Sequence, residues 1–226
     1  MNSYKNLQNQ DNRRHKMLLI LKGFRRGLNL SSSAIAQKMR YSGSMIRFYE
    51  DGKIQIKEEA LREYAAIIAK MVGLDRMNFY EMLVKEADNI QDGTSTEILK
   101  AISHLICYES TLDYFKEDSN EENEKSIANN MVMILACFRR ILMVGVDETM
   151  KIMHVFNLHR KEQGYLNAKK ELAQAYARFI AEQMNYKDFA YFYEVLEKES
   201  ARMENSIVQA FQNALKAFGR VVKQIY

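Results

Sequence analysis

Two pairs of side chains in this sequence have types and spacings that could hold a metal ion. His104 and Cys107 stand three residues apart and would share one face of a helix. A zinc site needs two further ligands, so we interpret this pair as packed core residues. His154 and His159 are five residues apart, which makes them diverge around a helix. The sequence therefore predicts no metal site.

No group in the sequence has the spacing of a catalytic motif. The stretch GTSTE after Asp92 lacks the lysine and the preceding strand of a phosphate-binding loop. Glu58 and Glu59 are neighbouring acids on a predicted helix surface, without a partner that would tune a carboxyl pKa for acid–base catalysis. We expect the protein not to be an enzyme and to need no cofactor.

The aromatic run FAYFYEVL at 189–196 leaves two interpretations open. Phe189, Phe192, Tyr193 and Leu196 could line a ligand or peptide pocket. The same side chains fit a hydrophobic core or a dimer interface, and this is the interpretation that we favour.

The elements that position any site are predicted to be helices. The 226 residues include no proline and nine glycines, and 47% of them are hydrophobic. No alternation of period two bounded by turns is found, so we predict an all-α fold.

No apolar run reaches the roughly 18 residues that cross a bilayer, and the polar N-terminus has no secretory signal. With only two cysteines, Cys107 and Cys137, these features predict a cytoplasmic protein.

Positive charge is concentrated near the N-terminus. Residues 1–90 carry 16 lysines and arginines against 10 acids, whereas residues 91–226 carry 17 against 19. Within residues 13–53 the imbalance is 10 against 2. This distribution predicts that one part of the chain meets a polyanion and that the other part has a different role.

The helical pattern divides the chain into three parts. We predict a disordered arm at 1–13, a basic helical domain at 14–90 and a helical dimerisation or regulatory domain at 91–226. The last helix, at 187–225, would be about 60 Å long if unbroken. It either bends, at Gly219 or at the polar stretch near Glu199, or pairs with a second copy of the chain, which is the interpretation that we favour. No short-period repeat is found.

Two further expectations concern the second half of the chain. The acidic stretch at 117–126 is expected to be a solvated connector. Asp147 is expected to cap a helix that ends near Gly164.

Residues 30–53, LSSSAIAQKMRYSGSMIRFYEDGK, contain two short helical patterns that follow each other at once. Ser31 and Ser42 are placed to cap them, and Gly52 is placed to close the second. Apolar residues form one face of each helix: Ile35, Ala36, Met39, Ile46 and Tyr49. Two capped helices joined by a tight turn would hold the second one outward, where it could enter the major groove of DNA.

This pattern, L-S-x-x-x-I-A-x-x-M-x-x-S-x-S-x-I-x-x-Y-E-x-G-K, resembles the helix-turn-helix of the phage lambda-repressor and Cro family. The resemblance covers about residues 14–87 and implies a domain of five helices followed here by an all-helical C-terminal bundle. It implies that helix 43–50 is the recognition helix, whose base-facing positions are Gly43, Ser44, Arg47 and Phe48. Phosphate contacts are expected from Ser31, Ser32, Ser42, Lys38, Arg40 and Lys53. A structural ion pair between Arg25 and Glu50 would fix the first helix against the third.

The sequence also departs from the family pattern. Arg40 stands in the turn where the family often has glycine, and the charge of Asp51 would oppose a phosphate. Gly43 and Ser44 offer little for hydrogen bonding to bases. Sequence readout is therefore expected to depend on Arg47, on Phe48 against thymine methyl groups, and on DNA shape.

We hypothesise a DNA-binding transcription regulator, from a bacterium or a phage, that binds double-stranded DNA as a homodimer. Arg13, Arg14 and Lys16 would extend the footprint, or would simply be charges at a helix start. One alternative is an interaction protein of the antitoxin or phage-inhibitor type, whose C-terminal domain binds a protein partner. Another is a regulator whose C-terminal domain senses a small-molecule or peptide effector.

Overall fold

The computed structural model describes residues 2–109, 123–145, 161–162, 168–203 and 209–226. Throughout these ranges the regular structure is helical and contains no strand, which confirms the all-α prediction for the described residues. The chain divides into two compact units, Met1–Glu109 (unit 1) and Ser110–Tyr226 (unit 2). None of the described helices is long and apolar enough to cross a lipid bilayer.

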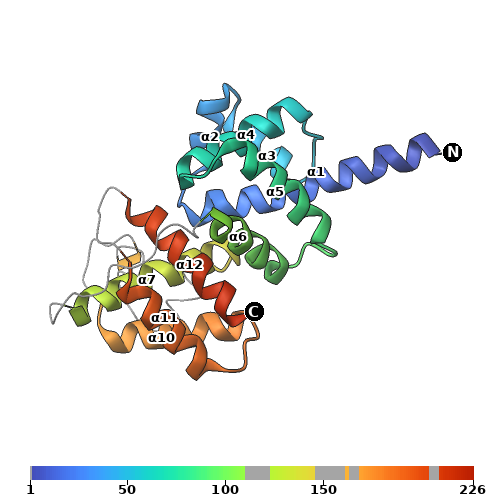
Figure 1. Cartoon of the computed structure of the whole chain (residues 1–226). Helices are drawn as coiled ribbons and strands as arrows, with labels where there is room; N and C mark the ends of the chain where they lie inside the picture. The colour runs from blue at the N-terminus through green and yellow to red at the C-terminus, as the bar shows by residue number, and fades with distance from the viewer. Residues whose placement is uncertain (1, 110–122, 146–160, 163–167, 204–208) are drawn as a thin grey trace. The chain divides into compact units, whose positions relative to one another are not determined.

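Unit 1 is built around a long first helix (Figure 1). Its described helices are α1 (Asn2–Gly27), α2 (Ser32–Met39), α3 (Gly43–Glu50), α4 (Glu58–Val72), α5 (Arg76–Asn89) and α6 (Ser95–Glu109). Helix α1 packs against α3, α4, α5 and α6, while α2 and α3 pack against each other. The largest buried side chains of α1 are apolar and follow helical spacing: Met17, Ile20, Leu21 and Phe24.

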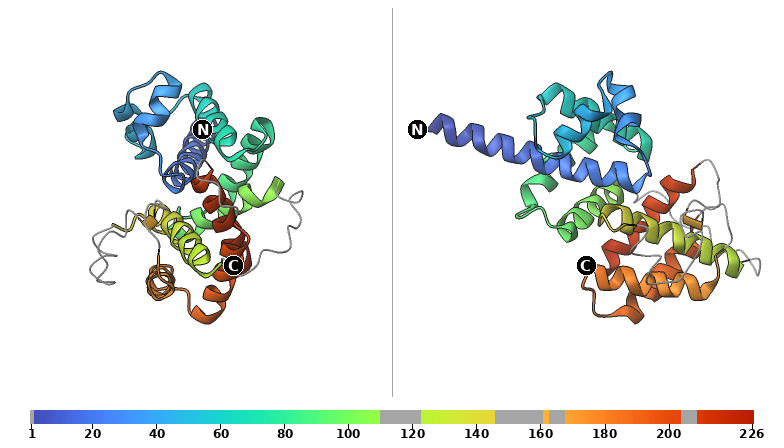
Figure 2. Two further views of the ribbon diagram at one scale, coloured as in Figure 1. Left: turned by 90° about the vertical axis from the view of Figure 1, so that its left-hand side faces the viewer. Right: turned by 180° about the vertical axis from the view of Figure 1, so that it is seen from behind.

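The predicted disordered arm is wrong, because α1 begins at Asn2. No glycine or proline occurs before Gly23 to interrupt the helix. Asp11 also joins the arm to the body of unit 1, since it accepts a hydrogen bond of 2.8 Å from the side chain of Gln55. The first turns of α1 project beyond the other helices of unit 1 (Figure 2).

The boundary between the units lies after α6, and not at residue 90 as the composition suggested. The polar stretch after α5 is a short connection, and α6 turns back onto α1 and α5. The approach to α1 is close: a Cβ atom on Gly23 would lie 2.6 Å from Cδ1 of Ile102. Residues of α6 with the helical spacing predicted for a core are buried here, namely Ile98, Leu99, Ile102, Leu105 and Ile106.

Unit 2 is arranged around α7 (Asn123–Ile141). Its other described helices are α10 (Lys170–Gln183), α11 (Phe189–Ala201) and α12 (Ala210–Ile225), and all three pack against α7. The expected connector at 117–126 therefore overlaps the start of α7, and 117–122 lie outside the described residues. The helix expected after Asp147 also lies outside them, except for Lys161 and Glu162, which are helical.

The terminal helix is not unbroken, and of the two alternatives the break near Glu199 is the one that the structure shows. Helix α11 ends at Ala201 and α12 begins at Ala210. Glu199 explains why the two helices fold together, since its buried carboxylate accepts hydrogen bonds from Arg220 and Gln224 of α12. A buried carboxylate is stable only with such partners. The length of the terminal helix therefore gives no argument for self-association.

Candidate nucleic-acid interface

The break between α2 and α3 is produced by local backbone geometry. Ser31 caps α2 by accepting a hydrogen bond of 3.1 Å from the backbone N–H of Ala34, and Ser42 caps α3 in the same way, from Met45. Arg40 ends α2 in the left-handed conformation, with φ of 57°. The chain then returns to extended backbone at Ser42 and starts a new helix.

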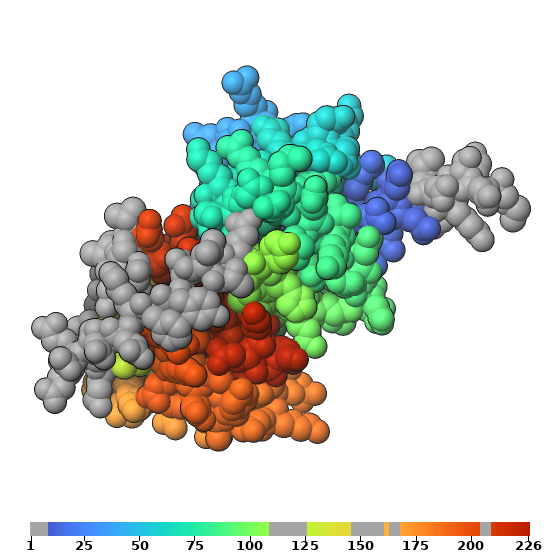
Figure 3. Space-filling model, viewed as in Figure 1, coloured from blue at the N-terminus to red at the C-terminus, as the bar shows by residue number. Residues whose placement is uncertain are grey.

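Each of the two helices has one buried and one exposed face. The residues expected to be buried are so: Ile35, Ala36, Met39, Ile46 and Tyr49. On the opposite side of α3, Ser44, Arg47 and Phe48 are exposed, and 40% of the Phe48 surface is open to solvent. In the space-filling view, light-blue and cyan atoms of the α2–α3 segment form an outer surface of unit 1 (Figure 3).

Gly43 has a packing role that the sequence did not reveal. A Cβ atom at this position would lie 2.5 Å from Oγ and 3.2 Å from Cα of Ser33. The first turn of α3 thus lies close to the first turn of α2, and Gly43 is only half-exposed. Its lack of a side chain permits this approach, which gives a structural reason for glycine at a position expected to face bases.

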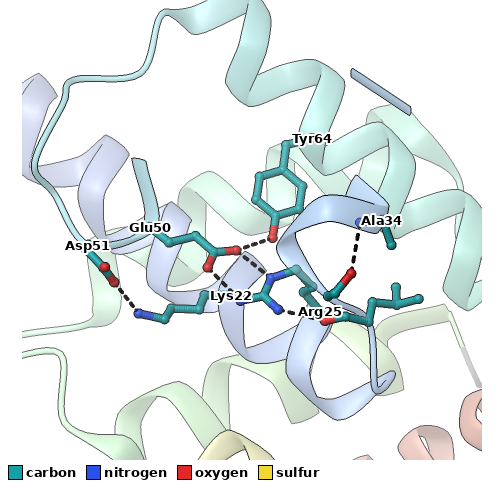
Figure 4. A network of polar contacts seen from close by, with 8 residues as sticks. Lys22, Arg25, Ala34, Glu50, Asp51 and Tyr64 are labelled. Carbon is teal, nitrogen blue, oxygen red and sulfur yellow. Dashed lines mark hydrogen bonds and ion pairs between the residues drawn. The ribbon is translucent and has the colours of Figure 1, made fainter. Parts of the chain in front are cut away.

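The orientation of α3 is fixed by a buried ion pair. Arg25 of α1 donates two hydrogen bonds of 2.7 Å to the two carboxylate oxygens of Glu50, and a third to the backbone carbonyl of Leu30. Tyr64 of α4 donates its hydroxyl proton to the same carboxylate at 2.7 Å. Figure 4 shows the three side chains converging from α1, α3 and α4. The pair implied by the resemblance is present, and Tyr64 is a partner that the sequence analysis missed.

The electrostatics of this network favour its ionised form. Burial opposes the charge of Arg25, but the hydrogen bonds and attraction from Glu50 outweigh it, and the pKa of Arg25 is raised. Burial and the negative charge of Glu50 raise the pKa of Tyr64 well above its ordinary value. The tyrosine therefore stays a hydrogen-bond donor at any physiological pH.

Asp51 does not act as an uncompensated negative charge. Its carboxylate accepts a hydrogen bond of 2.8 Å from the ammonium group of Lys22, and this contact lowers the pKa of Asp51 (Figure 4). The positive charge of Lys22 offsets the negative charge of Asp51, so Asp51 should repel a nearby phosphate less than the sequence suggested. Lys22 is correspondingly not free to contact a ligand.

The basic residues of α1 are occupied within unit 1. Arg13 pairs with Asp88 at 2.6 Å, and Arg14 lies within ion-pairing distance of Asp11 and Glu58. Lys16 donates to the backbone carbonyl of Ile90 at 2.6 Å. These contacts favour a structural role over an extended footprint for all three residues.

Five exposed cations lie on the α2–α3 segment and in the loop that follows it, and the fifth, Lys57, directly precedes α4. The other four are residues expected to contact DNA. Lys38, Arg40, Arg47 and Lys53 are exposed, and none of them forms an ion pair with the described part of the chain. The ammonium group of Lys53 lies 5.6 Å from the centroid of the Phe48 ring. Ser31 and Ser42 are exposed at the helix starts, and Ser32 is half-exposed. The expected phosphate-binding residues are therefore accessible together.

The other candidate sites of the sequence do not form a site. His104 lies 3.2 Å from a carboxylate oxygen of Glu86, and no group of three metal-ligand side chains occurs among the residues described. His154 and His159 lie outside those residues. In the aromatic run, Phe192 and Leu196 are buried, and the Phe192 ring packs edge-on against Phe138 at 5.8 Å. This burial favours the core interpretation.

Comparison with protein families, with characterised proteins and with solved structures gives no match to this chain. The interface is therefore argued from its own geometry and charge.

Proposed function

We propose that the chain is a sequence-specific transcription regulator that binds double-stranded DNA, with α3 in the major groove. The groove is about 12 Å wide and admits one helix. Support comes from the position of α3, whose outer face is exposed while its inner face is fixed by Arg25, Glu50 and Tyr64.

The observation that carries this proposal is the group of four exposed cations that form no close ion pair with the described residues. Lys38, Arg40, Arg47 and Lys53 all belong to the α2–α3 segment or the loop after it. By contrast, Arg13, Lys16 and Lys22 of α1 are engaged in contacts within unit 1. Each phosphate contact contributes about −0.9 to the slope of log affinity against log salt concentration. Three phosphate contacts, from Lys38, Arg40 and Lys53, predict a slope of about −2.7 for one head.

The exposed residues divide into two proposed roles. Arg47, Phe48 and Ser44 on the outer face of α3 contact base edges, and the other three cations contact phosphates with the capping serines. Arg47 is the side chain able to donate two hydrogen bonds to guanine. Gly43 contributes indirectly, because its missing side chain lets the first turn of α3 lie against Ser33 of α2.

We further propose that the DNA-bound form is a homodimer. One head with a single strong base reader binds weakly, and joining two heads makes the second contact intramolecular. The two half-sites would then lie one helical turn, about 34 Å, or a multiple of it apart.

Selection of bound duplexes from random sequence tests this proposal. The full chain is used at about 50 mM and about 200 mM salt. We expect an enriched palindrome at both concentrations. Binding without enrichment would restrict the function to nonspecific DNA binding, and failure to bind at the lower concentration would overturn the proposal.

A further inference from the structure

Unit 2 contains the same buried network as unit 1. Arg139 of α7 donates hydrogen bonds of 2.7 and 2.6 Å to the two carboxylate oxygens of Glu162, and a third to the backbone carbonyl of Val144. Tyr176 of α10 donates its hydroxyl proton to the same oxygen that Arg139 Nε contacts. In unit 1 the corresponding oxygen of Glu50 receives Arg25 Nε and Tyr64. Both networks place the tyrosine 14 residues after the glutamate and the carbonyl five residues after the arginine.

The backbone turn after each arginine is also the same. Each turn contains three backbone N–H to carbonyl hydrogen bonds at matching positions. In unit 1 they are Leu28 to Phe24, Asn29 to Arg26 and Leu30 to Arg25. In unit 2 they are Leu142 to Phe138, Met143 to Arg140 and Val144 to Arg139. The middle residue is left-handed in both turns, with φ of 58° for Asn29 and 66° for Met143. A non-glycine residue rarely adopts this conformation, so its recurrence at the matching position is informative.

Side-chain packing repeats in the same order. Phe24 meets Phe79 edge-on at 5.5 Å, and Phe138 meets Phe192 edge-on at 5.8 Å. Asp75 caps α5, and Asp188 caps α11.

A buried acid also recurs near the end of the helix that follows each capping aspartate. Glu86 of α5 contacts His104 of α6, and Glu199 of α11 pairs with Arg220 of α12. Both acids therefore join their helix to the last described helix of the same unit.

The sequence blocks at these positions correspond. Two blocks are identical in both units: FRR at 24–26 and 138–140, and LKA at 99–101 and 215–217. Two longer blocks are similar: YAAIIA at 64–69 with YARFIA at 176–181, and FYEMLVKE at 79–86 with FYEVLEKE at 192–199. The blocks fall on helices that stand in the same order, since α1, α4, α5 and α6 correspond to α7, α10, α11 and α12.

At positions that match the basic residues of unit 1, unit 2 carries less positive charge. Counted back from the matched FRR blocks, the positions of Arg13, Lys16 and Lys22 on α1 are occupied in α7 by Ile127, Asn130 and Ala136. Between Leu30 and Glu50 the sequence has three cations and no acid, whereas between Val144 and Glu162 it has three cations and two acids. Unit 1 as a whole carries 17 basic and 13 acidic residues, and unit 2 carries 16 of each.

We infer that the chain is a tandem duplication of one domain, in which only the first copy keeps a DNA-binding surface. The second part of this inference rests on the proposed function. Each chain then supplies one head, and the second head of a DNA-bound dimer comes from a second copy of the chain. Unit 2 is accordingly a copy of the DNA-binding fold that lacks the excess of positive charge. It is not a separate type of dimerisation bundle.

The duplication is tested in the full chain with the matched substitutions Tyr64→Phe and Tyr176→Phe. Each removes one hydroxyl donor to the buried carboxylate and leaves the ring in place. Hydrogen exchange should become roughly tenfold faster in α4 for Tyr64→Phe and in α10 for Tyr176→Phe, as loss of a hydrogen bond to a charged group predicts. If Tyr176→Phe leaves exchange in α10 unchanged while Tyr64→Phe accelerates α4, the two networks are not equivalent and the duplication is overturned.

The single DNA-binding surface is tested by two matched double substitutions in the full chain. One reverses the charges of Arg47 and Lys53 (R47E/K53E), and the other reverses two exposed lysines of unit 2 (K187E/K198E). With a random-sequence duplex at about 50 mM salt, the first should reduce affinity at least tenfold, and the second less than twofold. Equal losses, or a larger loss for the unit 2 variant, would overturn the inference. If the unaltered chain does not bind the duplex, the proposed function fails together with this second part, and the tyrosine pair still decides the duplication.

Discussion

Arg25 and Glu50 are 25 residues apart and meet in the interior of unit 1 through two hydrogen bonds of 2.7 Å. The pair joins α1 to the last residue of α3, a helix of only eight residues. A helix this short is not stable alone, so its orientation depends on tertiary contacts. Arg25 therefore acts on the proposed DNA surface by positioning α3, not by touching DNA.

Removal of one member of this buried pair should be strongly destabilising. We expect Arg25→Met to lower the free energy of unfolding of unit 1 by about 3–5 kcal/mol, because it leaves the charge of Glu50 buried and unpaired. Lys22→Met is the control, since it breaks the more exposed pair with Asp51 and should cost less than about 1 kcal/mol. Urea denaturation followed by circular dichroism, with hydrogen exchange to assign the unit, measures both. Similar costs for the two variants would contradict a dominant role for the buried pair.

The left-handed turn at Arg40 makes a prediction in which stability and affinity change in opposite directions. Replacement by glycine, Arg40→Gly, should stabilise unit 1 by about 1 kcal/mol, because a side chain is disfavoured at φ of 57°. The same change should weaken DNA binding and reduce the salt slope by about 0.9, since one phosphate contact is removed. Asn29→Gly is the control: asparagine tolerates this conformation, so the gain should be smaller and the affinity unchanged. Calorimetry and a salt titration of binding provide the two measurements.

Neighbouring arginines in α7 should respond oppositely to the same substitution. Arg139→Met should cost unit 2 about 3–5 kcal/mol, because Glu162 loses its partner. Arg140 is equally buried, but its two terminal nitrogens have no hydrogen-bond partner among the described residues, and the guanidinium packs near the Phe211 ring at 5.3 Å. We expect Arg140→Met to be neutral or stabilising, because an unsatisfied buried charge is replaced by an apolar chain. A cost above about 2 kcal/mol for Arg140→Met would show that the charge of Arg140 has a partner in solution.

The sequence predicted the parts of the site that depend on local spacing. The capping serines, the buried faces of α2 and α3 and the exposed side of α3 all follow from helical periodicity and capping chemistry. Tyr64 was missed because a core tyrosine and a hydrogen-bonding tyrosine have the same helical spacing. The pairing of Lys22 with Asp51 was missed because it depends on how α1 crosses the end of α3.

Three features that the sequence left wrong or undecided have physical causes of their own. The arm before Arg14 is polar, which suggested disorder, but it extends a helix that packs further along. The interruption at Glu199 indicated a possible bend, but helix periodicity resumes in α12, and the contacts of Glu199 with α12 that fold the chain back depend on tertiary structure. The inferred duplication is not a short-period repeat. Its matched blocks are short, and the spacing from arginine to glutamate is 25 residues in one copy and 23 in the other.

The two cysteines should differ in reactivity with a thiol reagent. Burial raises the pKa of Cys137 to about 12, whereas Cys107 is only half-buried. At pH 8 the folded chain should therefore react first at Cys107, and Cys137 should react only as unit 2 opens. Because the thiolate is the reactive form, raising the pH towards 9 should still leave Cys137 protected. Mass spectrometry of labelled peptides distinguishes the two sites, and early labelling of Cys137 would contradict its place in the core.

The proposed division between base and phosphate contacts makes the sharpest test of the interface. Arg47 projects from the outer face of α3, whereas Lys53 lies in the loop beyond it, near the Phe48 ring. Arg47→Ala should reduce the preference for the selected palindrome over random DNA, by about 1–3 kcal/mol for each recognised base pair. Lys53→Ala should weaken binding to both duplexes equally and lower the salt slope by about 0.9, since a phosphate contact is independent of sequence. Affinities of each variant for both duplexes at two salt concentrations separate these effects. An equal loss of preference in both variants would show that α3 does not read bases in the proposed orientation.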